Sequence, residues 1–93
     1  MPGASLDGVV VRPPDVIAVR VGDVMVLHDP RSDRYVRLNR TGELLWDYLS
    51  RGRSVRDMAA MLAARYGVPI ARAQQDVQRL VGDLLARGLL ESG

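Results

Sequence analysis

The sequence predicts an α+β fold of the winged helix-turn-helix type, in which an N-terminal three-stranded antiparallel sheet is followed by three helices. The hydrophobic period is two from residue 15 to residue 39 and changes to 3.6 over the rest of the chain. Strands that come first and helices that follow are typical of α+β proteins. A chain of 93 residues has room for one modest hydrophobic core, so we expect a single domain.

Three strands are expected, at residues 16–21, 24–28 and 34–38, and they form an antiparallel meander. Residues 22–23 are Gly-Asp, and glycine at the first position of a two-residue connection indicates a type II′ hairpin turn. Residues 29–33 have the composition of a loop, because Asp, Pro and Ser favour turns.

The chain before these strands has no amphipathic period. We expect a flexible tail over residues 1–8 and a single folded domain over residues 9–93. Residues 9–11 are three valines, and Pro13 and Pro14 follow them without amide hydrogens for a sheet ladder. Both prolines exclude a central strand at their own positions, which leaves the valines as a short edge strand or as an extended arm.

Three helices are expected, at residues 42–50, 55–65 and 71–87. Asn39 or Thr41 can cap the first helix and Ser54 the second, because their side-chain oxygens accept bonds from free amides of the first turn. Gly67 and Gly88 end the second and third helices, as glycine commonly does. Short helices with short connections should pack as a bundle against one face of the sheet.

The composition removes most catalytic chemistry. Without cysteine the chain has no disulfide, no thiolate metal site and no thiol nucleophile. His28 is the single histidine and cannot form a zinc site or a nucleophile–base pair alone, so we expect a structural or solvent-facing role. The glycines lie at predicted boundaries and form no phosphate-binding loop. We therefore expect a binding module with no catalytic residues, no metal and no cofactor.

Charge and hydropathy restrict the partners. All 13 basic residues are arginine, yet the formal net charge is only +2, which is weak support for nucleic-acid binding. The first residues show no signal-peptide pattern and no apolar stretch is long enough to cross a membrane. We expect a cytoplasmic protein without a membrane partner.

Two surfaces are candidates for binding. The third strand, residues 34–38, has a free edge that can accept an extended peptide as an added strand, although Arg34 and Arg37 could simply protect that edge from aggregation. The second and third helices could instead form a helix-turn-helix that binds DNA. Asp76 and Asp83 on the last helix argue against this alternative, since they lie among the side chains that would read the bases, and the small net charge could neutralise few phosphates.

A set of residues in fixed order resembles a known family. The set consists of Leu38, Asn39, Arg40, Thr41, Gly42, Leu45, Trp46, Leu49, Gly52, Ala59, Leu62, Tyr66, Gly67, Asp76, Val77, Leu84, Gly88, Leu89 and Leu90. In a chain with strands before three helices, this set resembles the PqqD-like family of recognition elements for ribosomally synthesised, post-translationally modified peptides. The resemblance is greatest to stand-alone leader-binding proteins of lasso-peptide biosynthesis clusters, and it covers the chain from about Val11 to Leu90.

The resemblance implies a non-catalytic protein that binds the leader segment of a precursor peptide and presents it to modifying enzymes. The leader would add as a strand to the third strand and lie between that strand and the last helix. The implied leader-binding residues are Arg34, Tyr35, Val36, Arg37 and Leu38 on the strand, and Gln74, Val77, Gln78, Val81 and Leu85 on the helix. The implied enzyme partner is a transglutaminase-like leader peptidase, with an asparagine-synthetase-like cyclase as a second candidate and with no nucleic acid or membrane.

One segment departs from the pyrroloquinoline-quinone branch of the family. That branch carries a Pro-Glu pair before the third strand, whereas residues 29–35 here read Asp-Pro-Arg-Ser-Asp-Arg-Tyr. This difference favours the lasso-peptide branch over a peptide chaperone for a radical enzyme. Arginine also recurs every third residue through the docking strand and its flanks, at Arg31, Arg34, Arg37 and Arg40. Arg34 or Arg37 could pair with a leader carboxylate, or both could act as edge protection only.

Overall fold

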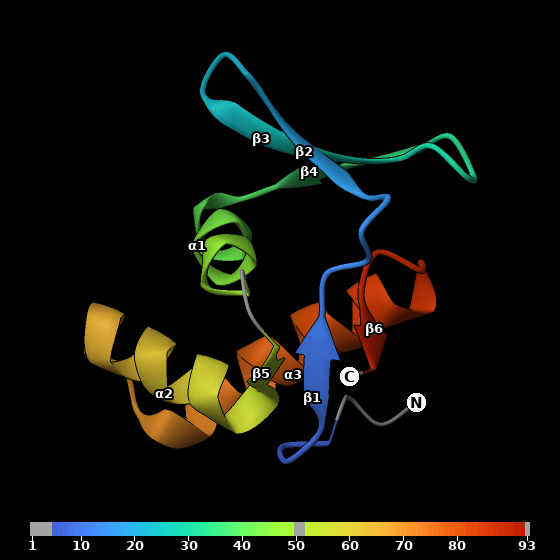
Figure 1. Cartoon of the computed structure of the whole chain (residues 1–93). Coiled ribbons are helices and arrows are strands. Elements are labelled where there is room, and N and C mark those ends of the chain that lie inside the picture. Colours follow the sequence, from blue (N-terminus) through green and yellow to red (C-terminus); the bar gives the residue numbers. More distant parts are fainter. Residues whose placement is uncertain (1–4, 50–51, 93) are drawn as a thin grey trace.

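A three-stranded antiparallel sheet lies above three helices in the computed structural model, which describes residues 5–49 and 52–92 (Figure 1). The sheet has the order β2-β3-β4. Its strands are β2 (Ile17–Val21), β3 (Val24–Asp29) and β4 (Arg34–Leu38). Each strand lies within one residue of its expected bounds, so the α+β prediction and the antiparallel meander are confirmed.

The β2–β3 hairpin turns at Gly22. Val21 and Val24 are the last paired residues, which leaves a two-residue connection. Gly22 has φ = 61°, and Asp23 has no positive φ. A positive φ at the first of the two positions alone is the signature of a type II′ turn, and glycine adopts it without steric cost.

The helices are α1 (Arg40–Tyr48), α2 (Val55–Tyr66) and α3 (Ile70–Ala86). The first helix begins two residues earlier than expected because Asn39 is its cap: the Asn39 side chain accepts a hydrogen bond from the amide of Gly42 at 2.7 Å. Ser54 caps α2 as expected and accepts from the amide of Asp57 at 3.0 Å. The expected end of the first helix, at residue 50, lies outside the described residues.

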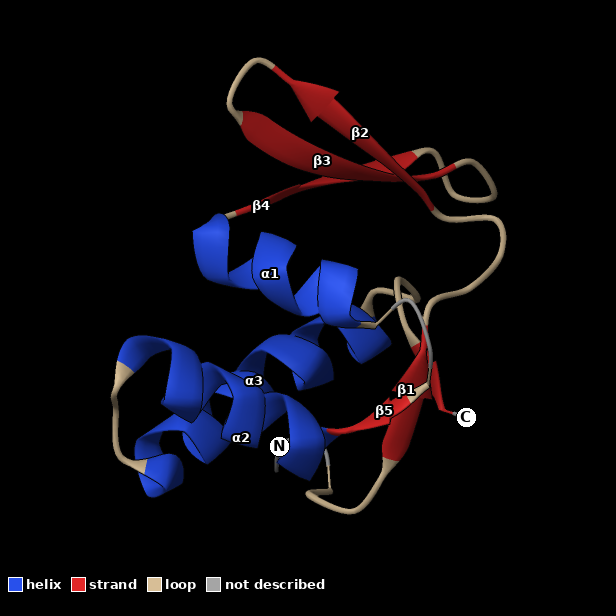
Figure 2. Cartoon of the chain, turned by 60° about the vertical axis from the view of Figure 1, so that its left-hand side comes forward, coloured by secondary structure: helices blue, strands red, loops and turns tan. Residues whose placement is uncertain are grey.

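A second, smaller sheet is absent from the sequence-based prediction. It has the order β5-β1-β6 and consists of β5 (Arg53–Ser54), β1 (Val9–Val11) and β6 (Glu91–Ser92). The three valines are therefore neither an edge strand nor an arm but the central strand of this sheet (Figure 2). Pro13 and Pro14 permit this because they follow the strand, and β5 and β6 are too short to show a period of two.

The residues just before β1 pack on the start of α2 instead of forming a tail. The carbonyl oxygens of Leu6 and Gly8 accept hydrogen bonds from the amides of Arg56 and Val55, at 2.8 and 3.2 Å. Leu6 also packs against the core. The flexible tail expected over residues 1–8 therefore does not extend to its second half, and its first half lies outside the described part of the chain.

One core joins the two sheets and the three helices. Trp46 is 3% exposed within it, with the Arg12 guanidinium 5.5 Å from its ring centroid. The other buried apolar residues are Val10, Leu27, Leu38, Leu45, Leu49, Val55, Met58, Ala59, Leu62, Ala73, Val77, Val81, Leu84, Leu89 and Leu90. Within residues 5–49 and 52–92, no helix has both the length and the apolar character needed to span a bilayer.

Candidate functional site

β4 is an edge strand of the larger sheet. It pairs with β3 along one side, and no described residue pairs with its other side. Alternate amide and carbonyl groups of an antiparallel edge strand point away from the sheet and are free to pair with another chain. The structure therefore brings the five strand residues of the predicted site, at positions 34–38, into one open edge.

The side chains of β4 alternate between two faces of the sheet. Val36 lies opposite Leu27, which is fully buried, and Leu38 is 6% exposed, so these residues face the core. Tyr35 and Arg37 project from the opposite, outer face, and Tyr35 is 64% exposed. A peptide strand added to β4 would continue both faces.

His28 supports Tyr35 on the outer face. Their rings stack with centroids 4.2 Å apart and an interplanar angle of 10°. His28 Nε2 also lies 3.1 Å from a carboxylate oxygen of Asp33, a residue of the β3–β4 loop with φ = 54°. The single histidine therefore has a structural role next to the edge strand, which is one of the two roles expected for it.

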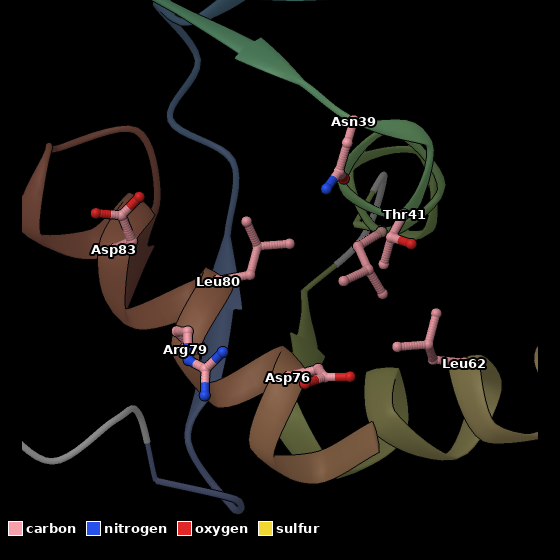
Figure 3. A pocket seen from close by; sticks show the side chains of 8 residues that line it. Asn39, Thr41, Leu62, Asp76, Arg79, Leu80 and Asp83 are labelled. Atoms are coloured by element: carbon pink, nitrogen blue, oxygen red, sulfur yellow. The ribbon is translucent and has the colours of Figure 1, made fainter. Parts of the chain in front are cut away.

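A cavity of about 570 Å³ lies where β4 ends, between the start of α1, the middle of α2 and the middle of α3 (Figure 3). Its apolar lining comes from Leu45 on α1, Leu62 on α2 and Leu80 on α3, whose side chain points into the gap between α3 and the end of β4. The polar lining residues are Asn39, Thr41, Asp76, Arg79 and Asp83. Cavities of this size with an apolar floor and a few polar groups are typical of ligand sites.

The cavity lies on a different flank of α3 from the one that the sequence suggested. Of the five helix residues predicted for the site, Val77 and Val81 are buried in the core, at 0% and 1% exposure. The other three, Gln74, Gln78 and Leu85, are half-buried, and none of the five lines the cavity. At 100° per residue these three lie on one side of the buried stripe, and the cavity-lining residues lie on the other.

A sequence signal for the cavity flank exists but is incomplete. Asp76, Leu80 and Asp83 have the spacing i, i+4, i+7 of one helix face. The opposite flank shows an equally regular spacing, so periodicity alone cannot tell which flank faces the edge strand. The sequence did not indicate that Leu45 of α1 and Leu62 of α2 line the cavity, because the helical period predicts both of them as core residues.

The start of β4 is held by a buried carboxylate. Asp29 is 4% exposed, the lowest value of any charged side chain in the described residues. One of its oxygens accepts hydrogen bonds from the backbone amide of Arg31 at 3.0 Å and from Arg31 Nε at 3.1 Å, and the other accepts from Ser32 Oγ at 3.2 Å. These bonds close the β3–β4 loop just before β4 begins.

Arg31 connects this loop to the end of α3. Its Nη2 donates to the carbonyl oxygen of Gly88 at 3.4 Å, and its Nη1 lies 4.0 Å from a carboxylate oxygen of Glu91. The hydrogen bond from Arg31 lowers the pKa of Asp29, and the same bond raises the pKa of Arg31. The larger sheet and the C-terminal end of α3 are thus joined by a charge-assisted network.

The described part of the chain contains no cluster of metal-ligating side chains. No group of three or more His, Cys, Asp or Glu side chains among residues 5–49 and 52–92 is placed to hold a metal ion. The open strand edge and the adjacent cavity are features of a binding site.

These features define a class of protein, the small peptide-binding module. They are the winged-helix-like fold, the free strand edge and the cavity next to the end of that strand. The family comparison agrees with this class: residues 25–90, more than half of the chain, match the family described as Coenzyme PQQ synthesis protein D (PqqD). This chain belongs to the PqqD family. A search of curated proteins finds no match.

Two solved structures have the same fold. One, described as a lasso peptide synthetase B1 complexed with the leader peptide, has a TM-score of 0.78 and 32% sequence identity, and the match covers 88% of this chain and 96% of that one. The other is TbiB1 in complex with the TbiA(beta) leader peptide, with a TM-score of 0.78 and 22% identity over 87% of this chain and 94% of that chain. Both neighbours are complexes of a protein with a leader peptide.

Proposed function

We propose that this protein is a non-catalytic recognition protein that binds the leader segment of a ribosomally synthesised precursor peptide. The leader adds to the open edge of β4 as a fourth strand of the larger sheet. The observation that carries the proposal is the position of this free edge beside a cavity, in a fold whose 32% identical neighbour is a leader-peptide complex.

Main-chain pairing to residues 34–38 fixes the register of the leader, and the cavity selects its side chains. We call the space between β4 and α3 the groove. Its apolar floor consists of Leu45, Leu62 and Leu80, and α3 forms its far wall. Among the helix residues, we infer that the flank of Leu80 faces the leader, with Asp76 and Asp83 at the rim. The flank of Gln74, Gln78 and Leu85 is the alternative wall.

The expected affinity follows from the buried apolar surface. An apolar side chain that is fully removed from water contributes about 1.5–3 kcal/mol, and two or three such anchors fit the groove. Association and ordering of a flexible peptide oppose this gain by several kcal/mol. A dissociation constant between micromolar and nanomolar requires about 8–12 kcal/mol in total, so main-chain pairing along β4 has to supply the remainder.

The proposed enzyme partner is a transglutaminase-like leader peptidase of lasso-peptide maturation, and an asparagine-synthetase-like cyclase is a second candidate. The protein would hold the leader while the peptidase cleaves the bond that follows it. The lasso branch is favoured by the 32% identical structural neighbour and by residues 29–35, which lack the Pro-Glu pair of the quinone branch. A peptide chaperone for a radical enzyme is the alternative within the family.

The decisive experiment searches the genes that flank the gene of this protein for a short precursor gene and titrates its fluorescein-labelled leader peptide into the protein. The expected result is saturable binding, with amide shifts in a ¹⁵N-labelled sample at β4 and along the cavity flank of α3. A reversed-sequence peptide is the control. Absence of binding, or shifts that avoid both β4 and α3, would contradict the proposal, and salt-dependent binding of duplex DNA would favour the helix-turn-helix alternative.

A further inference from the structure

We propose that Arg31 is a positioning residue that sets the spacing between β4 and α3 and thereby determines leader affinity without contacting the leader. The inference rests on the proposed function, because the two elements that Arg31 joins are the two walls of the proposed groove. It assigns a role to the β3–β4 loop, which lies outside the cavity.

The position of Arg31 is fixed from both sides. Toward the sheet, its Nε and its own amide donate to the carboxylate of Asp29, which is 4% exposed at the end of β3. Toward the helices, the guanidinium donates to the Gly88 carbonyl and approaches Glu91 of β6. A planar guanidinium with five donors suits such a bridge, whereas a lysine ammonium cannot reproduce its fork.

The end of α3 is built to receive this cation. The amide of Gly88 donates to Leu85 O at 3.1 Å and that of Leu89 to Leu84 O at 2.9 Å, the two bonds of a Schellman motif. Gly88 has φ = 74°, and the C-cap residue Arg87 is paired through Nε with Asp83 of the last turn at 3.2 Å. The Arg31 guanidinium adds a positive charge from another element of the fold, and it donates directly to a carbonyl at this helix C-terminus, where cations are favoured.

The bridge that Arg31 forms between Asp29 and Gly88 lies at one end of the groove. β4 begins at Arg34, three residues after Arg31, and α3 ends at Ala86, two residues before Gly88. Past the other end of β4, the cavity lies between Asn39, the residue that follows the strand, and the middle of α3. The bridge therefore fixes one end of the groove, and without it the sheet can move relative to α3 and the leader must restore their spacing when it binds.

The test compares Arg31→Gln, Asp29→Asn and the double variant in the leader titration. Arg56→Gln is a matched control, because Arg56 is 53% exposed against 49% for Arg31 and bonds Asp7 through Nε at the same 3.1 Å. We expect each single variant to lower leader affinity by about three- to tenfold, which is more than the loss of an exposed ion pair and less than the loss of a fully buried one. The double variant should be no weaker than the weaker single variant, because both remove one network. Arg56→Gln should bind as the wild type does.

A second measurement does not depend on the leader. The chain contains no cysteine, so spin labels can be placed at Ala18→Cys on β2 and Ala86→Cys on α3, two exposed alanines. Without leader, Arg31→Gln should broaden the distance distribution between the labels, and added leader should narrow it again. Arg56→Gln should leave the distribution unchanged.

The outcomes separate the two proposals. If the wild type binds but Arg31→Gln and Asp29→Asn bind equally well, the positioning role is wrong and the proposed function stands. If Arg31→Gln weakens binding while Asp29→Asn does not, Arg31 contacts the leader directly, which also overturns the positioning role. If the wild type binds no leader, the proposed function fails, and an unchanged distance distribution in Arg31→Gln would overturn the bridge as well.

Discussion

The two ends of β4 face α3 in different ways. At its start, the strand is tied to the end of α3 through Asp29, Arg31 and the carbonyl of Gly88. Just past its end, at Asn39, a cavity lined by three leucines lies between the chain and the middle of α3. Hydrogen bonds suit the fixed end because they are directional and restrict the relative position of the two elements. An apolar cavity suits the open end because any apolar side chain that fills it gains free energy from burial. The groove is therefore fixed at one end by hydrogen bonds, and at the other end it can bury side chains of a bound peptide.

The largest expected effect comes from a charge placed at the open end. Leu80→Asp should lower leader affinity by about tenfold to hundredfold, because it removes apolar contact of about 1.5–3 kcal/mol from the cavity floor. Leu85→Asp is the matched control, since Leu85 is also a half-buried leucine of α3 that packs against the core, but on the other flank. Fluorescence anisotropy measures affinity, and thermal unfolding checks that both variants fold. If Leu85→Asp lowers leader affinity more than Leu80→Asp does, the leader contacts the flank of Gln74 and Gln78 instead.

The strand between the two ends should respond unequally to proline. Tyr35→Pro and Val36→Pro each remove one amide, and in an antiparallel edge strand neighbouring amides point in opposite directions. One variant should lose leader affinity by about tenfold with little change in stability, and the other should lose about 1–3 kcal/mol of stability through the β3 ladder. Leader titration and urea unfolding of both variants give the comparison. Equal effects on both quantities would argue against strand addition.

The fixed end should show a pH dependence. Because the pKa of Asp29 in the folded protein is below its ordinary value of about 3.9, the carboxylate stabilises the fold above about pH 4, and this contribution is lost as the pH falls through the folded pKa. The difference in unfolding free energy between wild type and Asp29→Asn should therefore be largest near pH 7 and shrink below pH 4. Urea unfolding at several pH values measures it, with Asp23→Asn in the exposed hairpin turn as the control. A difference that is the same at all pH values would show that the charge of Asp29 does not stabilise the fold.

The smallest effects are expected from the arginines of the edge itself. Arg34 and Arg37 are exposed and project to opposite faces of the sheet, so either can reach a leader carboxylate only through solvent-exposed contacts. Arg34→Ala and Arg37→Ala should each lower affinity by about two- to fivefold at low salt, and by less at about 0.5 M salt. If both variants bind leader unchanged at low salt, these arginines protect the edge and do not recognise the peptide.

Local sequence signals predicted most of the elements for identifiable reasons. Gly22 before Asp23 specified the hairpin turn through its positive φ, and Ser54 specified the start of α2 through its cap. The small sheet was missed because β5 and β6 have two residues each, and only contact between distant segments makes them strands. The sequence allowed either Asn39 or Thr41 as the cap of α1. The hydrogen bond that Asn39 accepts from the amide of Gly42 identifies Asn39 as the cap.

The candidate site shows the same division between local and tertiary information. The sequence alone is enough to predict the edge strand and the buried stripe of α3, because a period of two and a period of 3.6 each define which side chains face the core. It did not determine which flank of that stripe faces β4, since both flanks have equivalent spacing. That choice depends on tertiary packing: α1 and α2 lie around the Leu80 flank, where the cavity is, and Arg31 joins the larger sheet to Gly88 after the end of α3. Periodicity describes a helix about its own axis, whereas a groove depends on how that axis lies against another element.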